Sequence, residues 1–228
     1  MGHGRIEVLR DDVSVLVIVD VLSFSTAVYV AVSRGACVYP FAYGKDEDAQ
    51  IAAGRVGAVL ASQRRAAGGQ LSLSPVSLMG ISPGSKLVLP SPNGSRLSLA
   101  CGGVPVLAGC LRNAAAIAVA AQRLARGGRI GVVPAGERWP DGSLRPATED
   151  LLGAGAILHH LGLNCSPEAQ VARDAFRSAG SRLPELVRGS VSGCELAERG
   201  FADDVAIAVE LDVSGIAPIL RDGAYRCL

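Results

Sequence analysis

The sequence predicts an α/β fold, with a mainly parallel sheet and helices on both of its faces. Short apolar runs alternate with helix-like segments along most of the 228-residue chain. The first run, residues 15–19, holds five apolar residues of which four are β-branched, as in a strand buried on both faces. Strands that alternate with helices at this spacing form βαβ units, whose right-handed crossovers place helices on both sides of the sheet.

Glycine and proline mark the ends of several expected elements. Gly35, Gly54 and Gly127 each follow a helical segment, whereas Pro90 and Pro92 break a strand. In chain order, the expected strands are residues 15–19, 36–41, 58–61, 86–89, 104–108 and 129–133. The expected helices are residues 25–33, 46–53, 95–100, 113–125, 149–161, 167–178 and 183–199.

The remaining segments are expected to be less regular. We expect a single domain over residues 1–228, and a division into two lobes is left open. Residues 62–85 are rich in Gly, Ser and Pro without a clear period, which predicts a flexible or functional segment. Residues 134–146 are expected to form a loop, and residues 205–209 and 216–220 short strands or an extra layer.

The composition excludes several classes of protein. Hydrophobic residues make up 49% of the chain and aromatic residues 4%, so the expected core is aliphatic. The net charge of +1 gives no basic patch for nucleic acid, and no apolar run approaches the ~18 residues of a membrane span. The N-terminus lacks an apolar signal region, which favours a cytoplasmic protein. The six cysteines form no CxxC pair, which disfavours a zinc site.

The first candidate site lies where the first strand ends. Asp20 follows that strand directly, and Ser23, Ser25 and Thr26 open the next helix. Ligands of open α/β sheets bind beyond the carboxyl ends of strands, and free N–H groups at a helix start favour anions. Asp20 is therefore placed to hold a metal or a polar substrate, and the hydroxyls to bind an anion. The alternative is that Asp20 only caps the following helix.

A second polar cluster follows the strand of residues 86–89. Asn93, Gly94, Ser95 and Arg96 lie between that strand and a helical run. A glycine loop between a strand and a helix presents backbone N–H groups to an anion, so these residues are candidate substrate ligands. The alternative is an ordinary Asn-Gly turn.

Acidic residues form the third cluster. Glu149 and Asp150 open the helix of residues 149–161 beside Thr148, a natural N-cap, and Glu137 lies in the preceding loop. That loop is expected at the same sheet edge as Asp20. Carboxylates that converge from different strand ends suit Mg²⁺, which takes few protein ligands and keeps several waters. The alternative is that Glu149 and Asp150 only complement the helix dipole.

Other chemistries find less support in the sequence. A GxGxxG loop and a Walker lysine loop are both missing, which disfavours a nucleotide-binding domain. Leu22 stands two positions after Asp20, so the chain lacks the Asp-x-Asp pattern of aspartyl-phosphate phosphatases.

These clusters together resemble the 2-phosphosulfolactate phosphatase family over nearly the whole chain. The segments that carry the resemblance are Asp20-Val-Leu-Ser-Phe-Ser-Thr-Ala, Ser72-Leu-Ser-Pro-Val, Ser91-Pro-Asn-Gly-Ser-Arg, Pro134-Ala-Gly-Glu, Glu149-Asp-Leu-Leu-Gly-Ala-Gly-Ala, Gly200-Phe-Ala-Asp-Asp and Leu211-Asp-Val-Ser. The resemblance implies an α/β phosphatase that hydrolyses a small anionic phosphate ester with Mg²⁺, a step toward coenzyme M in organisms that make it. The chain differs from the usual family pattern at three places. It has Ser23 where the family usually has arginine, and Pro134 where the family usually has cysteine. It has Ala61-Ser-Gln-Arg where the family usually has a Gly-Glu-Arg loop.

The resulting expectation is Mg²⁺-dependent hydrolysis of 2-phosphosulfolactate or a related ester by a metal-activated water. Asp20, Glu149 and Asp150 are expected to hold the metal, and Glu137 to act as general base. The alternative is a non-catalytic protein that binds a small anionic metabolite on the same fold. The missing arginine favours that alternative, since serine at position 23 cannot copy the planar, bidentate contacts of an arginine. The retained acids favour the enzyme, because a binding protein need not keep three acids at strand ends, whereas a Mg²⁺ enzyme must. A homodimer is left open.

Overall fold

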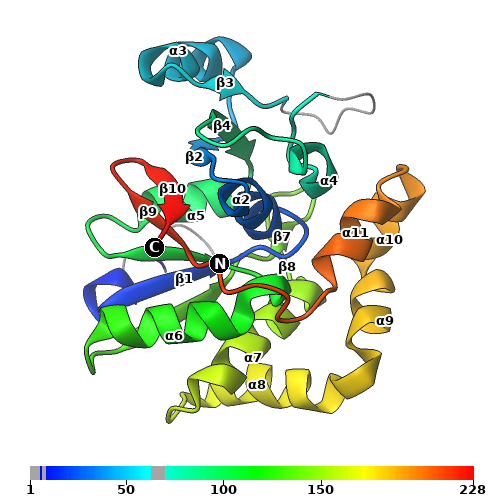
Figure 1. Ribbon diagram of the computed structural model, residues 1–228. Coiled ribbons are helices and arrows are strands. Elements are labelled where there is room, and N and C mark those ends of the chain that lie inside the picture. The colour runs from blue at the N-terminus through cyan, green and yellow to red at the C-terminus, as the bar shows by residue number, and fades with distance from the viewer. Residues whose placement is uncertain (1–5, 7–8, 63–69) are drawn as a thin grey trace.

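The computed structural model describes residue 6 and residues 9–62 and 70–228 of the chain (Figure 1). Within these residues, the main sheet has eight strands in the order β3-β4-β2-β10-β9-β5-β1-β6. Their bounds are β1 (Val15–Val19), β2 (Cys37–Ala42), β3 (Val59–Leu60), β4 (Lys86–Ser91), β5 (Val106–Gly109), β6 (Ile130–Pro134), β9 (Pro218–Arg221) and β10 (Ala224–Cys227). A separate two-stranded hairpin is formed by β7 (Glu137–Arg138) and β8 (Leu144–Arg145).

The main sheet consists of two parallel blocks joined by an antiparallel hairpin. In one block β1 pairs in parallel with β5 and β6, and in the other β4 pairs in parallel with β2 and β3. The hairpin of β9 and β10 lies between β5 and β2 and pairs with both in antiparallel fashion. The α/β class with a mainly parallel sheet is therefore confirmed. Because three antiparallel pairings separate the two blocks, their strands run in opposite senses along the sheet.

The helices surround this sheet. Their bounds are α2 (Phe24–Ser33), α3 (Asp46–Val56), α4 (Pro75–Leu78), α5 (Gly94–Ala100), α6 (Ala114–Ala125), α7 (Thr148–Leu161), α8 (Pro167–Ala179), α9 (Leu183–Arg188), α10 (Val191–Glu198) and α11 (Ala202–Ala208). Figure 1 shows α6, α7 and α8 on one side of β1 and α2 on the other. None of the described helices is long and apolar enough to span a membrane.

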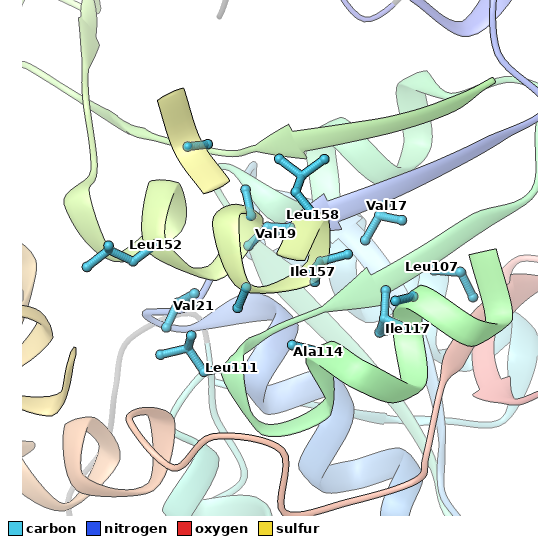
Figure 2. Packing of buried hydrophobic residues seen from close by; sticks show 14 of the residues in the cluster. Val17, Val19, Val21, Leu107, Leu111, Ala114, Ile117, Leu152, Ile157 and Leu158 are labelled. Carbon is cyan, nitrogen blue, oxygen red and sulfur yellow. The ribbon is translucent and has the colours of Figure 1, made fainter. Parts of the chain in front are cut away.

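Strand β1 is the centre of two hydrophobic cores. All five of its residues are fully buried, as its β-branched sequence predicts. Val15, Val17 and Val19 face the core formed with α6 and α7, whereas Leu16 and Ile18 face the core formed with α2. Figure 2 shows the first core, with Val17 and Val19 against Ile117 of α6 and Ile157 of α7.

Several expected elements are wrong or incomplete. Residues 205–209 are not a strand, because residues up to 208 belong to α11; residues 218–221 are β9. The expected helix 183–199 is two helices, since the Ser190 hydroxyl caps α10 after Gly189. The expected loop 134–146 contains the hairpin of β7 and β8. Within the segment 62–85, α4 is helical, and residues 63–69 lie outside the described residues.

Candidate active site

The ends of β1 and β6 lie side by side and bring the first and third predicted clusters together. Val19 pairs with Pro134, so Asp20 and the turn before Glu137 follow adjacent parallel strands. Helix α7 approaches closely at Gly153, where an added Cβ would lie 2.7 Å from Val21 Cγ2. This close approach holds the first turn of α7, with Glu149 and Asp150, against the end of β1, as the sequence predicts for the sheet edge.

Asp20 accepts hydrogen bonds from two loops. Its Oδ1 accepts from the Phe24 N–H at 3.0 Å, so it does cap α2, and its Oδ2 accepts from the Gly94 N–H at 3.0 Å. The second bond brings the predicted Asn-Gly loop to the acidic cluster. Glycine is required there because a Cβ at position 94 would lie 2.2 Å from Cδ1 of the Phe24 ring. Asp20 therefore joins the end of β1 to the loop that follows β4.

Asp150 links the turns after β1 and β6. Its Oδ1 accepts from the Val21 N–H at 2.7 Å, and its Oδ2 accepts from the Gly136 N–H at 2.9 Å. Both carboxylate oxygens thus bind backbone donors, which makes Asp150 a brace between two loops. The helix itself begins at Thr148, one residue earlier than an N-cap at Thr148 would allow, because Ala147 occupies the N-cap position.

Glu137 and Glu149 complete the acidic cluster. Asn93 Nδ2 donates to Glu137 Oε2 at 2.9 Å, which ties the β4 loop to the hairpin of β7 and β8. Glu149 is only 2% exposed, and its carboxylate takes no part in the hydrogen bonds that join these loops. The other three acidic side chains, Asp20, Glu137 and Asp150, all accept hydrogen bonds from the surrounding loops.

The electrostatics of this cluster follow from burial and from mutual repulsion. Burial, followed by the negative charges of Glu137 and Glu149, raises the pKa of Asp20 to about 7. The pKa of Asp150 is raised well above its usual value by burial and by the charges of Asp20 and Glu149. Burial also raises the pKa of Glu137, although the hydrogen bond from Asn93 and the charge of Arg145 oppose that rise. Ionisation of one carboxyl group in the cluster therefore disfavours ionisation of its neighbours.

The predicted hydroxyl ligands are engaged with the backbone. Ser25 Oγ donates to Ile18 O at 2.9 Å, Thr26 Oγ1 to Val21 O at 2.7 Å, and Ser95 Oγ to Leu89 O at 3.0 Å. These bonds shape the loops around Asp20, and substrate binding by these three hydroxyls stays a prediction. Ser23 is buried at the N-cap position of α2.

Two arginines stand beside the cluster. A cavity of about 20 Å³, which is room for about one water, is lined by Asn93, Arg96, Glu137 and Arg138, with Pro92, Leu97, Ala135 and Leu144. Arg96 was predicted as an anion ligand from its place in the Asn-Gly loop. Arg138 was missed, because nothing in the sequence of residues 134–146 indicates the hairpin that carries it.

A second missed feature anchors this hairpin. The Arg145 guanidinium donates to both oxygens of Glu195 on α10, with both distances at 3.1 Å, and lies over the Trp139 ring. Arg145 also pairs with Glu137 in the hairpin. The two partners of the ion pair are 50 residues apart in the chain, so no local pattern could reveal the contact.

Within the described part of the chain, the acidic cluster does not form a complete metal site from protein ligands alone. Among residues 9–62 and 70–228, no three His, Cys, Asp or Glu side chains are disposed as ligands of one ion. A Mg²⁺ ion needs fewer, because it is commonly held by one or two carboxylates together with waters and substrate oxygens. The donor chemistry suits it, since the buried carboxylates repel one another and a cation would relieve that repulsion.

Comparison with known proteins then identifies the family. The family model described as 2-phosphosulpholactate phosphatase matches residues 6–223. The chain belongs to the 2-phosphosulpholactate phosphatase family. It is 31% identical to the 2-phosphosulfolactate phosphatase of Methanothermobacter thermautotrophicus over 93% of this chain and 89% of that protein. It is 26% identical to the probable 2-phosphosulfolactate phosphatase of Pseudothermotoga lettingae over 92% of this chain and 91% of that protein.

The remaining segments that resemble this family serve as structural ties. Ser74 Oγ and the Val76 N–H both donate to Asp204 Oδ1, at 2.6 and 3.0 Å, so the segment 72–76 is fastened to α11. Asp212 Oδ1 accepts from the Ala115 N–H at 2.8 Å, which fastens the segment 211–214 to α6. In this member of the 2-phosphosulpholactate phosphatase family, these segments thus hold helices together.

Proposed function

We propose that the protein hydrolyses 2-phosphosulfolactate or a closely related small phosphate ester in the presence of Mg²⁺. The observation that carries the proposal is the buried cluster of Asp20, Glu137, Glu149 and Asp150 in a chain of this family. Buried carboxylates are costly unless they are paired or bind a cation. Their presence at the joined ends of two strands therefore suggests a function rather than a structural need.

The proposed metal ligands are Asp20 and Glu149, with Asp150 as the third predicted ligand. Glu149 is the strongest candidate because its carboxylate takes no part in the hydrogen bonds that join the loops, whereas both Asp150 oxygens accept backbone N–H bonds. When bound, Mg²⁺ would neutralise phosphate charge and lower the pKa of an attacking water.

Glu137 is the proposed general base. Its raised pKa brings proton transfer closer to neutral pH, which is where a general base is effective. The Asn93 amide donates to Glu137 Oε2 and so orients the carboxylate. As the oxygen of the attacking water bonds to phosphorus, Glu137 would accept a proton from that water. The bond between phosphorus and the ester oxygen would break, and the proton would pass to the departing alkoxide.

Recognition of the substrate is proposed for the basic residues beside the cluster. 2-Phosphosulfolactate bears a phosphate, a sulfonate and a carboxylate, and a cluster of carboxylates alone would repel it. Arg96 and Arg138 supply positive charge next to Asn93 and Glu137. Ser23, Ser25, Thr26, Asn93, Gly94 and Ser95 remain the predicted ligands of the anionic oxygens.

The test is a screen of purified protein for phosphate release from 2-phosphosulfolactate and other small phosphate esters, with and without Mg²⁺. Glu149→Gln keeps the shape of the side chain and removes the charge, so it should abolish turnover. Binding of these esters with no phosphate release under any condition would instead support the non-catalytic binding protein, which the serine at position 23 favours.

A further inference from the structure

Ser91 carries a buried hydroxyl that the fold does not use. It is the last residue of β4, is 1% exposed, and its Oγ makes no hydrogen bond within the described residues. Burying an unpaired hydroxyl destabilises a protein, so such groups call for an explanation. A binding partner from outside the chain is one such explanation.

Neighbouring buried hydroxyls behave differently. Ser95 Oγ donates to Leu89 O at 3.0 Å, and Ser98 Oγ bonds Gly94 O and the Tyr225 hydroxyl, both at 2.7 Å. Polar groups in this part of the fold thus readily find partners in the backbone or in side chains. Ser91 is an exception in a region that is otherwise well paired.

The position of Ser91 connects it to the acidic cluster. Asn93 and Gly94, two and three residues later, reach Glu137 and Asp20 respectively. Three peptide steps of 3.8 Å keep the Ser91 Cα within about 11 Å of the Gly94 Cα. Side chains alternate along a strand, so Ser91 lies on the same face of β4 as Leu89, in the core that contains Phe24.

The surroundings of Ser91 favour a role as a hydrogen-bond donor over a role as a nucleophile. A nucleophilic serine needs a base within hydrogen-bonding reach, and Ser91 Oγ has no such partner among the described residues. A hydroxyl without a base remains a hydrogen-bond donor. We propose that Ser91 is a further substrate-binding residue, whose Oγ–H donates to an anionic oxygen of the phosphate ester; this rests on the proposed function.

Ser91→Ala separates this role from a structural one. Because the wild-type hydroxyl is unpaired, its removal should leave the urea midpoint unchanged or higher. The loss of a hydrogen bond to a charged oxygen should weaken binding by about 10- to 100-fold. Affinity is measured by calorimetry with inorganic phosphate and with sulfolactate, in the presence of Mg²⁺, and KM is measured with 2-phosphosulfolactate.

Ser98→Ala is the matched control. It removes a buried serine hydroxyl that has two partners, so the urea midpoint should fall while both affinities stay within about twofold of wild type. Wild-type affinity of Ser91→Ala for both probes would overturn the inference, as would a wild-type protein that binds neither probe. Failure of the proposed function looks different: the wild type would bind the probes and Ser91→Ala would not, yet neither would release phosphate.

Discussion

The Gly94 N–H donates to Asp20 Oδ2 at 3.0 Å, although the two residues are 74 positions apart in the chain. Asp20 follows β1 in one parallel block of the sheet, and Gly94 follows β4 in the other. This bond therefore joins the two blocks at the candidate active site. The bond requires glycine at position 94, because the backbone there lies against the Phe24 ring and leaves no room for a Cβ.

Gly94→Ala should disrupt this junction. A Cβ 2.2 Å from Phe24 Cδ1 forces the ring or the loop to move, and overpacking of this kind typically costs about 1–3 kcal/mol. The Asp20 carboxylate should lose its second donor, so activity should fall with stability. Gly54→Ala is the control, because nothing lies within 4 Å of a Cβ there and alanine favours the helix. Equal urea midpoints for the two variants would contradict the packing at Gly94.

The raised pKa of Asp20 predicts how stability depends on pH. The folded protein holds this proton up to about pH 7, whereas the unfolded chain releases it near pH 3.8. The folded state therefore binds more protons between these values, and stability should fall as the pH rises through that window. Urea midpoints measured without divalent cations should show this decline. Asp20→Asn should flatten it, and an equal slope in the variant would assign the decline to other groups.

Mg²⁺ should reverse that loss of stability above pH 7. A ligand at 100 times its dissociation constant stabilises the folded state by about 2.7 kcal/mol. For a chain of this length, that corresponds to a rise in the melting midpoint of roughly 5–10 °C. Scanning calorimetry should show the rise in wild type and its loss in Glu149→Gln and Asp20→Asn. A rise of the same size in all three proteins would place the cation elsewhere.

Arg145 and Glu195 should act on Glu137 in opposite directions. The charge of Arg145 lowers the pKa of Glu137 and that of Glu195 raises it. Arg145→Gln should therefore move the acidic limb of the kcat/KM profile to higher pH, and Glu195→Gln to lower pH. The ion pair is partly exposed, so removing it should cost only about 0–1 kcal/mol of stability. Shifts in the same direction would show that the hairpin had simply come loose.

The sequence predicts the individual helices and strands better than it predicts the tertiary contacts and strand pairings between them. The five consecutive apolar residues of β1, four of them β-branched, are typical of a strand buried on both faces, and the fold buries all five. The division of residues 183–199 into two helices is harder to predict. A serine can lie within a helix, and Ser190 is recognisable as an N-cap only because the first helix ends at Gly189. The place of β9 and β10 in the middle of the sheet depends on pairings with strands more than 100 residues earlier.

The same limit applies to the candidate site. Asp20, Glu149 and Glu137 could be selected because carboxylates at strand ends and helix starts have a recognisable context. The hydrogen bond from Asn93 to Glu137 and the ion pair of Arg145 with Glu195 could not be selected, because each depends on the tertiary path of the hairpin. The roles of hydroxyl groups are equally hard to predict from sequence. Ser25 Oγ donates a hydrogen bond to a backbone carbonyl, whereas Ser91 Oγ has no partner within the described residues.

The central claim is tested most directly by phosphate release from 2-phosphosulfolactate, measured at saturating Mg²⁺ for wild type and for Glu149→Gln. Wild type should release phosphate catalytically, the release should stop when the metal is chelated, and Glu149→Gln should be inactive while it remains folded. An absence of release by wild type from this and every other small phosphate ester tested, at any Mg²⁺ concentration, would contradict the claim.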